Sequence, residues 1–286
     1  MKLITTKTLI LASAVALTFT ACKKDETSDA DSDKVTAVDN QAADDLSTDV
    51  IDQFNMVTMN QMAIANSAPG KAVEATVNED ARTTSGSVTI SPVDYATFPK
   101  TITINFGTGT VDKYGVVRKG KIVGVLSNHW WISGAELRID MQDYYVNGIQ
   151  VKGTKILTSN GFNAETNSFS YNVSVDRARI NEEGNSFTWS ATRTVSYFTK
   201  GTNTALDDYI TVTGSTSGTN RKGKAFTTTI IQELKKPVIS RWIVSGIIEH
   251  KVADRPTVTL DYGDGTIDNK AKVTVGDATV EITLHK

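Results

Sequence analysis

Apolar and polar residues alternate with a period of two along most of the chain after residue 86. The alternation is clearest near the end, where the apolar positions are Val258, Leu260, Tyr262, Val280, Ile282 and Leu284. A period of two puts successive side chains on opposite faces of a strand, so each strand has one dry face and one wet face. That pattern is typical of antiparallel sheets, because strands of parallel sheets are usually buried on both faces. We therefore predict twelve or thirteen antiparallel strands between residues 87 and 286.

A different period appears before the strands. Between residues 36 and 65 the apolar positions fall three or four apart, at Val38, Ala42, Leu46, Val50, Phe54 and Val57. This spacing predicts one amphipathic helix over 36–65 that packs on the β domain. Residues 66–85 contain Pro69-Gly70 and few apolar side chains, which indicates a linker.

The predicted fold is therefore mainly β, with one N-terminal helix followed by a large antiparallel sheet over residues 86–286. A sheet of this size is expected to close as a barrel or to fold as a sandwich. Both forms produce the same alternation, so the sequence leaves the choice open.

Two Asn-Gly pairs predict turns within the β domain. Asn147-Gly148 lies between two alternating runs and is a strong hairpin signal, because both turn residues adopt positive φ. A regular hairpin around it would place Asp143 opposite Lys152. Asn160-Gly161 predicts a second turn.

One segment of the β domain occurs twice. Residues 101–112 align without gaps with residues 257–268, and six of the twelve positions are identical. Two related hairpins are thus expected near the two ends of one continuous sheet. Asp261, Asp264 and Asp268 of the second copy are carboxylates that a calcium ion would accept. A tight glycine turn explains the same residues and is the preferred interpretation, so we predict no metal site.

The first residues predict export. Lys2 and Lys7 precede an apolar run over 9–19 that is too short to span a bilayer. The run ends in Ala21-Cys22, and Cys22 is the only cysteine of the 286 residues. We predict a lipoprotein signal peptide over residues 1–21, with Cys22 as the lipid acceptor. The alternative is an ordinary signal peptide followed by a stray thiol.

The residues after Cys22 resemble a surface-export signal. Lys23, Lys24, Asp25 and Glu26 match the C-x-K-(D/E)-(D/E) pattern of Bacteroidota lipoproteins that are carried to the outer face of the outer membrane. The resemblance implies a lipid-anchored protein at the outer membrane and on the cell surface. A charged, solvated linker is the competing interpretation.

Three motifs of the β domain carry a wider resemblance. They are Phe98–Gly109, Tyr144–Gly148 and Asp261–Thr266. Through them the chain resembles an uncharacterised family of Bacteroidota outer-membrane lipoproteins. The resemblance brings no activity with it.

Charge is unevenly spread along the chain. Residues 22–50 hold three lysines and nine acids, a local charge of −6, whereas residues 86–286 hold 23 basic and 19 acidic residues, a local +4. The acidic residues 22–35 are expected to form an extended tether, because like charges repel. A charge of +4 over some 200 residues forms no basic stripe, so we predict no nucleic-acid partner.

Catalytic motifs are scarce. His129, His250 and His285 are far apart and lack metal-ligand spacing, and neither a G-x-S-x-G nor an H-E-x-x-H motif occurs. The acidic pairs Glu182-Glu183 and Asp207-Asp208 are expected in solvated turns, with a glycosidase pair as the less favoured alternative. We therefore predict no catalytic residue, no cofactor and no enzymatic activity.

The sequence offers one candidate ligand surface, at His129, Trp130 and Trp131. Exposed tryptophans form a flat surface on which a sugar ring or another protein can rest. The three residues are expected on a strand edge, where at least one tryptophan would face the core. Arg177 and Arg193 continue apolar alternations and should point inward, either at a rim beside acids or into a polar cavity.

The expected function is a structural or interaction role at the outer membrane, with the N-terminal lipid as the anchor. The alternative is a ligand-binding lipoprotein. Its ligand would be a glycan on the exposed aromatic residues or an apolar molecule inside a half-open barrel.

Overall fold

The computed structural model describes Val50, Ile51, Phe54 and residues 86–284, except 93, 95, 113, 114, 183, 184, 202–205 and 241. The predicted signal peptide, tether and linker, and most of the predicted helix over 36–65, lie outside the described residues. Within them, no helix has the length and apolar character needed to cross a membrane.

Thirteen strands make up the described part of the β domain. Their bounds are β1 Ser87–Ser91, β2 Lys100–Val111, β3 Val117–Leu126, β4 Glu136–Val146, β5 Ile149–Asn163, β6 Ser168–Glu182, β7 Asn185–Phe198, β8 Tyr209–Thr219, β9 Ala225–Pro237, β10 Ser245–Val252, β11 Val258–Asp264, β12 Lys270–Val275 and β13 Ala278–Thr283. The number agrees with the count predicted from the alternation.

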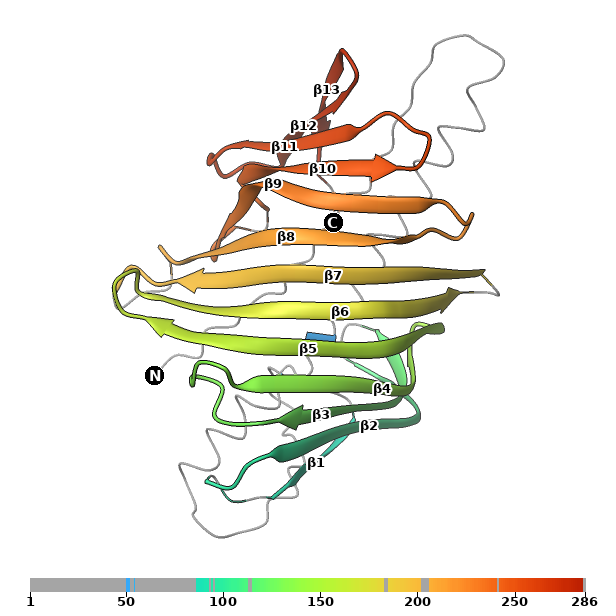
Figure 1. The fold of residues 1–286 in the computed structure, drawn as a ribbon, viewed down its shortest axis with the longest axis vertical. Helices are drawn as coiled ribbons and strands as arrows, with labels where there is room; N and C mark the ends of the chain where they lie inside the picture. The colour runs from blue at the N-terminus through green and yellow to red at the C-terminus, as the bar shows by residue number, and fades with distance from the viewer. Residues whose placement is uncertain are drawn as a thin grey trace.

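The strands form one antiparallel sheet in chain order, from β1 to β13. Each strand pairs with the next through a short connection, so neighbours in sequence are neighbours in space (Figure 1). The predicted antiparallel sheet is confirmed. The predicted closure as a barrel or sandwich is not: among the described strands there is a single sheet, with β1 and β13 at the two ends of the pairing order. Alternation reports which face of a strand is dry, and it carries no information on whether the sheet closes.

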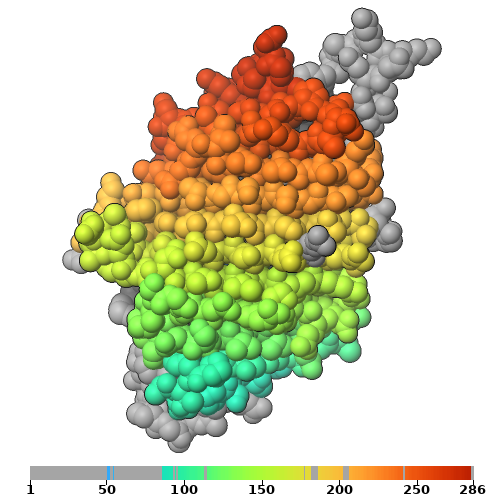
Figure 2. All heavy atoms as spheres, in the orientation of Figure 1, coloured from blue at the N-terminus to red at the C-terminus, as the bar shows by residue number. Residues whose placement is uncertain are grey.

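Most of the buried side chains lie on one face of the sheet, which we call the inner face. One cross-strand row of this face runs through Ile102, Gly124, Ile139, Lys155, Val175, Ala191, Thr216, Thr228, His250 and Val258. Apolar residues fill most of the row from β2 to β7, apart from buried Lys155 on β5, and polar side chains occupy it from β8 to β10. The opposite, outer face appears in Figure 2 as a continuous surface across all the strands.

Two hydrophobic clusters build the core. The first cluster spans mainly β1 to β7 and includes Val50 and Phe54. The second spans β8 to β13, with Val212, Leu234 and Tyr262 among its members. Half-buried Val195 of β7 packs against both clusters and joins them.

The three described residues of the predicted helix lie against the inner face. Val50, Ile51 and Phe54 are helical, and Val50 and Phe54 are fully buried. The Phe54 ring occupies the space above Gly124, because a Cβ added to this glycine would lie 2.3 Å from Phe54 Cε1. Figure 1 shows this short blue segment behind β5. The extent of the helix beyond these residues stays a prediction.

The first Asn-Gly pair forms the predicted hairpin. Asn147 and Gly148 have φ values of 48° and 85°, and Val146 pairs with Ile149. The predicted pairing of Asp143 with Lys152 is wrong, because the register shifts between Asp140 and Tyr144 and Asp143 itself adopts a φ of 45°.

The second Asn-Gly pair does not form a turn. β5 continues through Asn160 and Gly161 to Asn163, and the register shifts between Ser159 and Gly161. Gly161, with a φ of 79°, therefore belongs to a β-bulge. Positive φ is needed in bulges as well as in turns, so the same residues fit both.

The repeated segment has the same local structure in both copies. Asn105 Oδ1 accepts a hydrogen bond from the Gly107 N–H at 3.0 Å, and Asp261 Oδ1 accepts one from the Gly263 N–H at 2.9 Å. The two copies form β2 and β11. Because these strands are nine positions apart in an antiparallel order, the two copies run in opposite directions.

Candidate functional site

Successive connections of this sheet lie at alternate ends of the strands. The β1–β2, β3–β4, β5–β6, β7–β8, β9–β10 and β11–β12 connections share one end, seen on the left in Figure 1. We call it the aromatic end, because aromatic side chains gather there on the inner face and in the β3–β4 connection.

An inner-face group of aromatic residues lies at this end. The Trp130 ring is 6.2 Å from that of Phe169 and 5.9 Å from that of Tyr171. Phe169 pairs across strands with Phe162 on one side and with Tyr197 on the other. Of these side chains, Phe162 is 58% exposed and the others are half-buried. The first cluster therefore ends in an aromatic surface that is only partly covered.

A second aromatic stack lies in the β3–β4 connection. The rings of His129 and Trp131 stack at 4.4 Å with an interplanar angle of 14°, and the Phe98 ring meets His129 edge-on at 4.6 Å. Trp131 is 43% exposed. Its neighbour Trp130 packs against the first cluster. One tryptophan thus faces the core and the other faces outward.

The local sequence explains the shape of this connection. The predicted strand edge is wrong, because residues 127–135 form turns between β3 and β4. Asn128 Oδ1 accepts a hydrogen bond from the His129 N–H at 2.8 Å, and Gly134 adopts a φ of 84°. The Gly134 N–H donates to the Ser159 carbonyl at 2.8 Å, which holds the connection against β5. The divergence of Trp130 and Trp131 therefore comes from turn geometry.

The sequence did not predict a polar pair at the aromatic end, formed by half-buried Tyr197 and buried Asp208. The Tyr197 hydroxyl donates a hydrogen bond to Asp208 Oδ2 at 2.5 Å, and Asp208 is buried. Burial raises the pKa of Tyr197, and the hydrogen bond to Asp208 and the charge of this carboxylate raise it further. The prediction that Asp207-Asp208 lies in a solvated turn is wrong for Asp208. Nothing in the local sequence indicates its burial, because Tyr197 and Asp208 come together only when β7 pairs with β8.

The carboxylates of the second repeat accept hydrogen bonds within the turns that contain them. Asp264 Oδ1 accepts hydrogen bonds from the Thr266 N–H at 3.1 Å and from its hydroxyl at 2.8 Å, and these bonds lower the pKa of Asp264. Asp268 Oδ1 accepts one from the Lys270 N–H at 2.9 Å. The part of the chain that the structure describes contains no group of three or more metal-ligating side chains. The turn interpretation accounts for these acids.

The described histidines and arginines lie at separate places on the sheet and do not form one site. His250 Nδ1 lies 2.8 Å from the Thr228 hydroxyl on the inner face, far along the sheet from His129, and His285 lies outside the described residues. Arg193 faces inward, as expected, and its guanidinium lies 5.9 Å from the centre of the Trp189 ring. The side chain of Arg177 lies outside the described residues.

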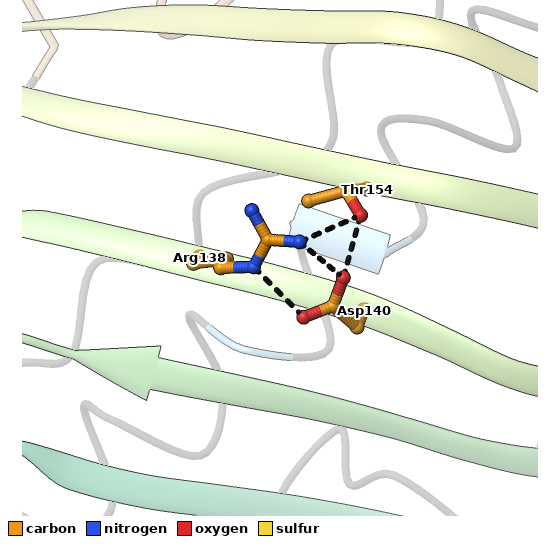
Figure 3. A network of polar contacts seen from close by, with 3 residues as sticks. All are labelled: Arg138, Asp140 and Thr154. Carbon is orange, nitrogen blue, oxygen red and sulfur yellow. Dashed lines mark hydrogen bonds and ion pairs between the residues drawn. The ribbon is translucent and has the colours of Figure 1, made fainter.

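The outer face is built from small polar side chains. Ser174, Thr192, Ser215 and Thr229 form one cross-strand row across β6 to β9. Figure 3 shows a charged group on β4 and β5, in which Arg138 Nε donates to Asp140 Oδ2 at 3.1 Å. Thr154 joins it through its hydroxyl, which accepts from Arg138 at 3.2 Å and donates to Asp140 at 2.5 Å.

Comparison with known proteins gives no relative. No protein-family model matches the chain, and no curated protein or solved structure matches it. The family resemblance and the export signal at Cys22 and Lys23–Glu26 therefore stay predictions from the sequence. Function has to be argued from the aromatic end itself.

Proposed function

We propose that this chain is a lipoprotein anchored at the outer membrane through lipid on Cys22, displayed on the cell surface through the export signal Lys23–Glu26. We propose that its role is structural or interactive and involves no catalysis. In this proposal the aromatic end is the contact surface. The observation that carries the proposal is the partial exposure of Phe162 and Trp131 beside a sheet with a large inner face.

Exposed aromatic side chains need an explanation in such a fold. Transfer of apolar surface from water is favourable by about 25 cal/mol per Å², and the inner face buries residues of the same kind a few strands away. Contact surfaces are enriched in tryptophan, tyrosine and phenylalanine. A sheet also holds its side chains in a fixed arrangement, which lowers the entropy lost on binding.

The proposal includes a form for the whole domain. A curled sheet with a helix over 36–65 against its inner face makes a half-open barrel, and the aromatic end is one of its two rims. The burial of Val50 and Phe54 against the inner face supports this form.

Glycan binding is a second candidate for the same surface. The stacked pair His129–Trp131 presents a flat aromatic face, and sugars stack on such faces through their C–H groups. Lys100 lies beside it, with its Nζ 5.0 Å from the centre of the Phe98 ring. Under this alternative, oligosaccharides would quench tryptophan fluorescence in the natural protein and not in Trp131→Phe. Trp242→Phe is the matched control, because Trp242 packs against the second cluster.

Protease shaving of intact cells tests the location. We expect the β domain to be digested from the surface of intact cells, and Cys22→Ala to release the protein from the membrane fraction. Protection until the outer membrane is broken would place the domain in the periplasm and would refute surface display.

Photo-crosslinking in cells tests the contact surface. A photoreactive amino acid at position 131 should form crosslinks, whereas the same amino acid at position 111 should form few. Val111 is a matched control, because it is exposed at the opposite end of the sheet. Equal crosslinking at both positions would contradict a contact role for the aromatic end.

A further inference from the structure

Large apolar side chains project from the successive connections of the aromatic end. They are Trp131 and Ile132 in β3–β4, Phe162 at the end of β5, Leu206 in β7–β8, Ile239 in β9–β10 and Ile267 in β11–β12. Each is between 43% and 67% exposed. We call these six residues the apolar tips. They occur at every connection of this end from β3 to β12.

The opposite end of the sheet differs. In the described residues, the other exposed large apolar side chains are Val111 and Val117, which flank the single β2–β3 connection of that end, and Ile231 and Val280, which lie within β9 and β13. Surface connections are usually polar, and the core of this sheet lies on its inner face, so the fold itself does not require the tips. Their gathering at one end indicates a surface that another apolar phase covers.

We infer that the apolar tips dock on the lipid surface of the membrane that holds the protein. The inference deepens the proposed contact role of the aromatic end and rests on the proposed lipid anchor. The tips enter the boundary between headgroups and acyl chains, where tryptophan and aliphatic side chains are both favourable.

The arrangement of the tips favours a bilayer over a protein partner. From the β3–β4 to the β11–β12 connection the tips are distributed over eight strand spacings, about 40 Å along the sheet. Apart from Trp131 and Ile132, each tip lies at or beside a different connection. A fluid bilayer accepts separate projections without a matching surface, whereas a protein partner would have to be complementary to each of them.

Charge around the tips favours a neutral lipid surface. Among the described residues, the connections of this end hold Lys200 and five acids, Asp94, Glu165, Asp207, Asp208 and Asp268, so an anionic lipid surface would repel them. Binding should therefore depend on apolar burial and change little with salt, because only a net charge near an anionic surface is screened.

The anchor makes weak docking sufficient. Cys22 and Val50 are 28 positions apart in the chain. Such a length of chain spans at most about 90–100 Å, which sets the volume within which the domain is confined near the bilayer. Confinement raises the effective concentration of the tips at the lipid surface, so modest individual contributions are enough.

Quenching by brominated lipid tests the inference. The lipidated protein, purified from its own cells, is reconstituted in phosphatidylcholine vesicles that carry bromine on their acyl chains. Trp131 is the exposed tryptophan among the described residues. The emission of Trp131 is obtained by subtracting the emission of Trp131→Phe from that of the natural protein. We expect bromine to quench most of the Trp131 emission.

Two further variants separate docking from folding. Leu206→Asp with Ile239→Asp should weaken docking by about tenfold or more, because charged groups replace apolar ones at the interface, and should restore the Trp131 emission. Val111→Asp, at the opposite end, should leave the quenching unchanged. Circular dichroism identifies any variant that fails to fold. In that case the comparison of the natural protein with Trp131→Phe still measures the quenching of Trp131 by bromine.

Two results would overturn the inference. One is that bromine lowers the tryptophan emission of the natural protein and of Trp131→Phe by the same amount. The other is protection of Trp131 from aqueous iodide before vesicles are added, which would assign the tips to a second copy of the chain. Mass measurement of the acyl chains on Cys22 tests the anchor by itself, so failure of the anchor and failure of docking are distinguishable.

Discussion

Charged pairs of this sheet occupy two different environments. Arg118 Nη1 and Asp112 Oδ2 are 2.7 Å apart with side chains only 5% and 12% exposed, whereas Arg138 and Asp140 are 3.1 Å apart and 48% and 38% exposed. Asp112 also accepts a hydrogen bond from the Val116 N–H at 3.0 Å. The buried pair therefore holds the β2–β3 connection, and the exposed pair lies on a solvated face.

Replacing each acid by asparagine should separate the two cases. Asp112→Asn leaves the Arg118 charge in a buried site, and we expect a loss of about 2–4 kcal/mol in the free energy of unfolding. Asp140→Asn should cost less than about 1 kcal/mol, because exposed pairs are screened by water. Urea denaturation of both variants measures the difference. Equal losses would contradict the assigned environments.

Tyr197 should make stability depend on pH in the alkaline range. Burial and then Asp208 raise the pKa of Tyr197 above its unfolded value of about 10, so the neutral hydroxyl is the form that the fold favours. Its contribution to stability is fully present below about pH 10 and is lost as the pH rises through the folded value.

Tyr197→Phe tests this dependence. We expect the variant to be less stable than the natural protein at neutral pH and to lose less stability above about pH 10, because the phenyl ring has no proton to lose. Urea midpoints measured across the alkaline range give the comparison. Parallel curves for the two proteins would show that Tyr197 titrates normally.

At the scale of elements, one contact joins the N-terminal region to the sheet. Phe54 fills the space above Gly124 on the inner face of β3. The sequence predicts a helix here, and it marks Phe54 as a member of the apolar stripe. It does not indicate that a glycine on β3 leaves the room for the ring, because this match depends on two segments about 70 residues apart.

A double-mutant cycle tests the contact. Phe54→Ala should cost about 3–5 kcal/mol through the cavity that it leaves. Gly124→Ala should cost about 1–3 kcal/mol in the natural protein, because its Cβ meets the ring, and clearly less in the Phe54→Ala background, where Leu137 Cδ1 at 3.1 Å is the remaining close contact. Thermal unfolding of the four proteins gives the coupling. Additive losses would mean that the ring does not occupy this space.

The Asn-Gly pairs show how far local sequence determines an element. At Asn147-Gly148 positive φ produces the predicted hairpin, whereas at Asn160-Gly161 it produces a bulge inside β5. The difference lies in the neighbouring strands. Ser159 and Gly161 are held by the β3–β4 connection and by β6, so the strand continues past the pair.

At the scale of the whole molecule, the core is unequally divided. Among the described residues the first cluster contains 23 buried hydrophobic side chains and the second contains seven. Between them the inner row carries Thr216, Thr228 and His250, which contribute little apolar burial. The last strands should therefore open more readily than the first.

Hydrogen exchange tests this division. We expect backbone amides of β10 to β13 to exchange with a lower opening free energy than those of β3 to β6, because local stability follows buried apolar contacts. Mass spectrometry of peptides from the exchanged protein measures both groups. Uniform exchange along the sheet would mean that the two clusters unfold as one unit.

The sequence by itself determined the strands, their antiparallel pairing and the hairpin turn at Asn147-Gly148, because alternation and positive-φ residues act over a few neighbouring positions. Only the tertiary structure decided the burial of Asp208 and the gathering of the apolar tips at one end. These depend on the register of many strand pairs and on which connections share an end of the sheet. Each register shift moves every later residue relative to the first strands, so no local pattern contains the result.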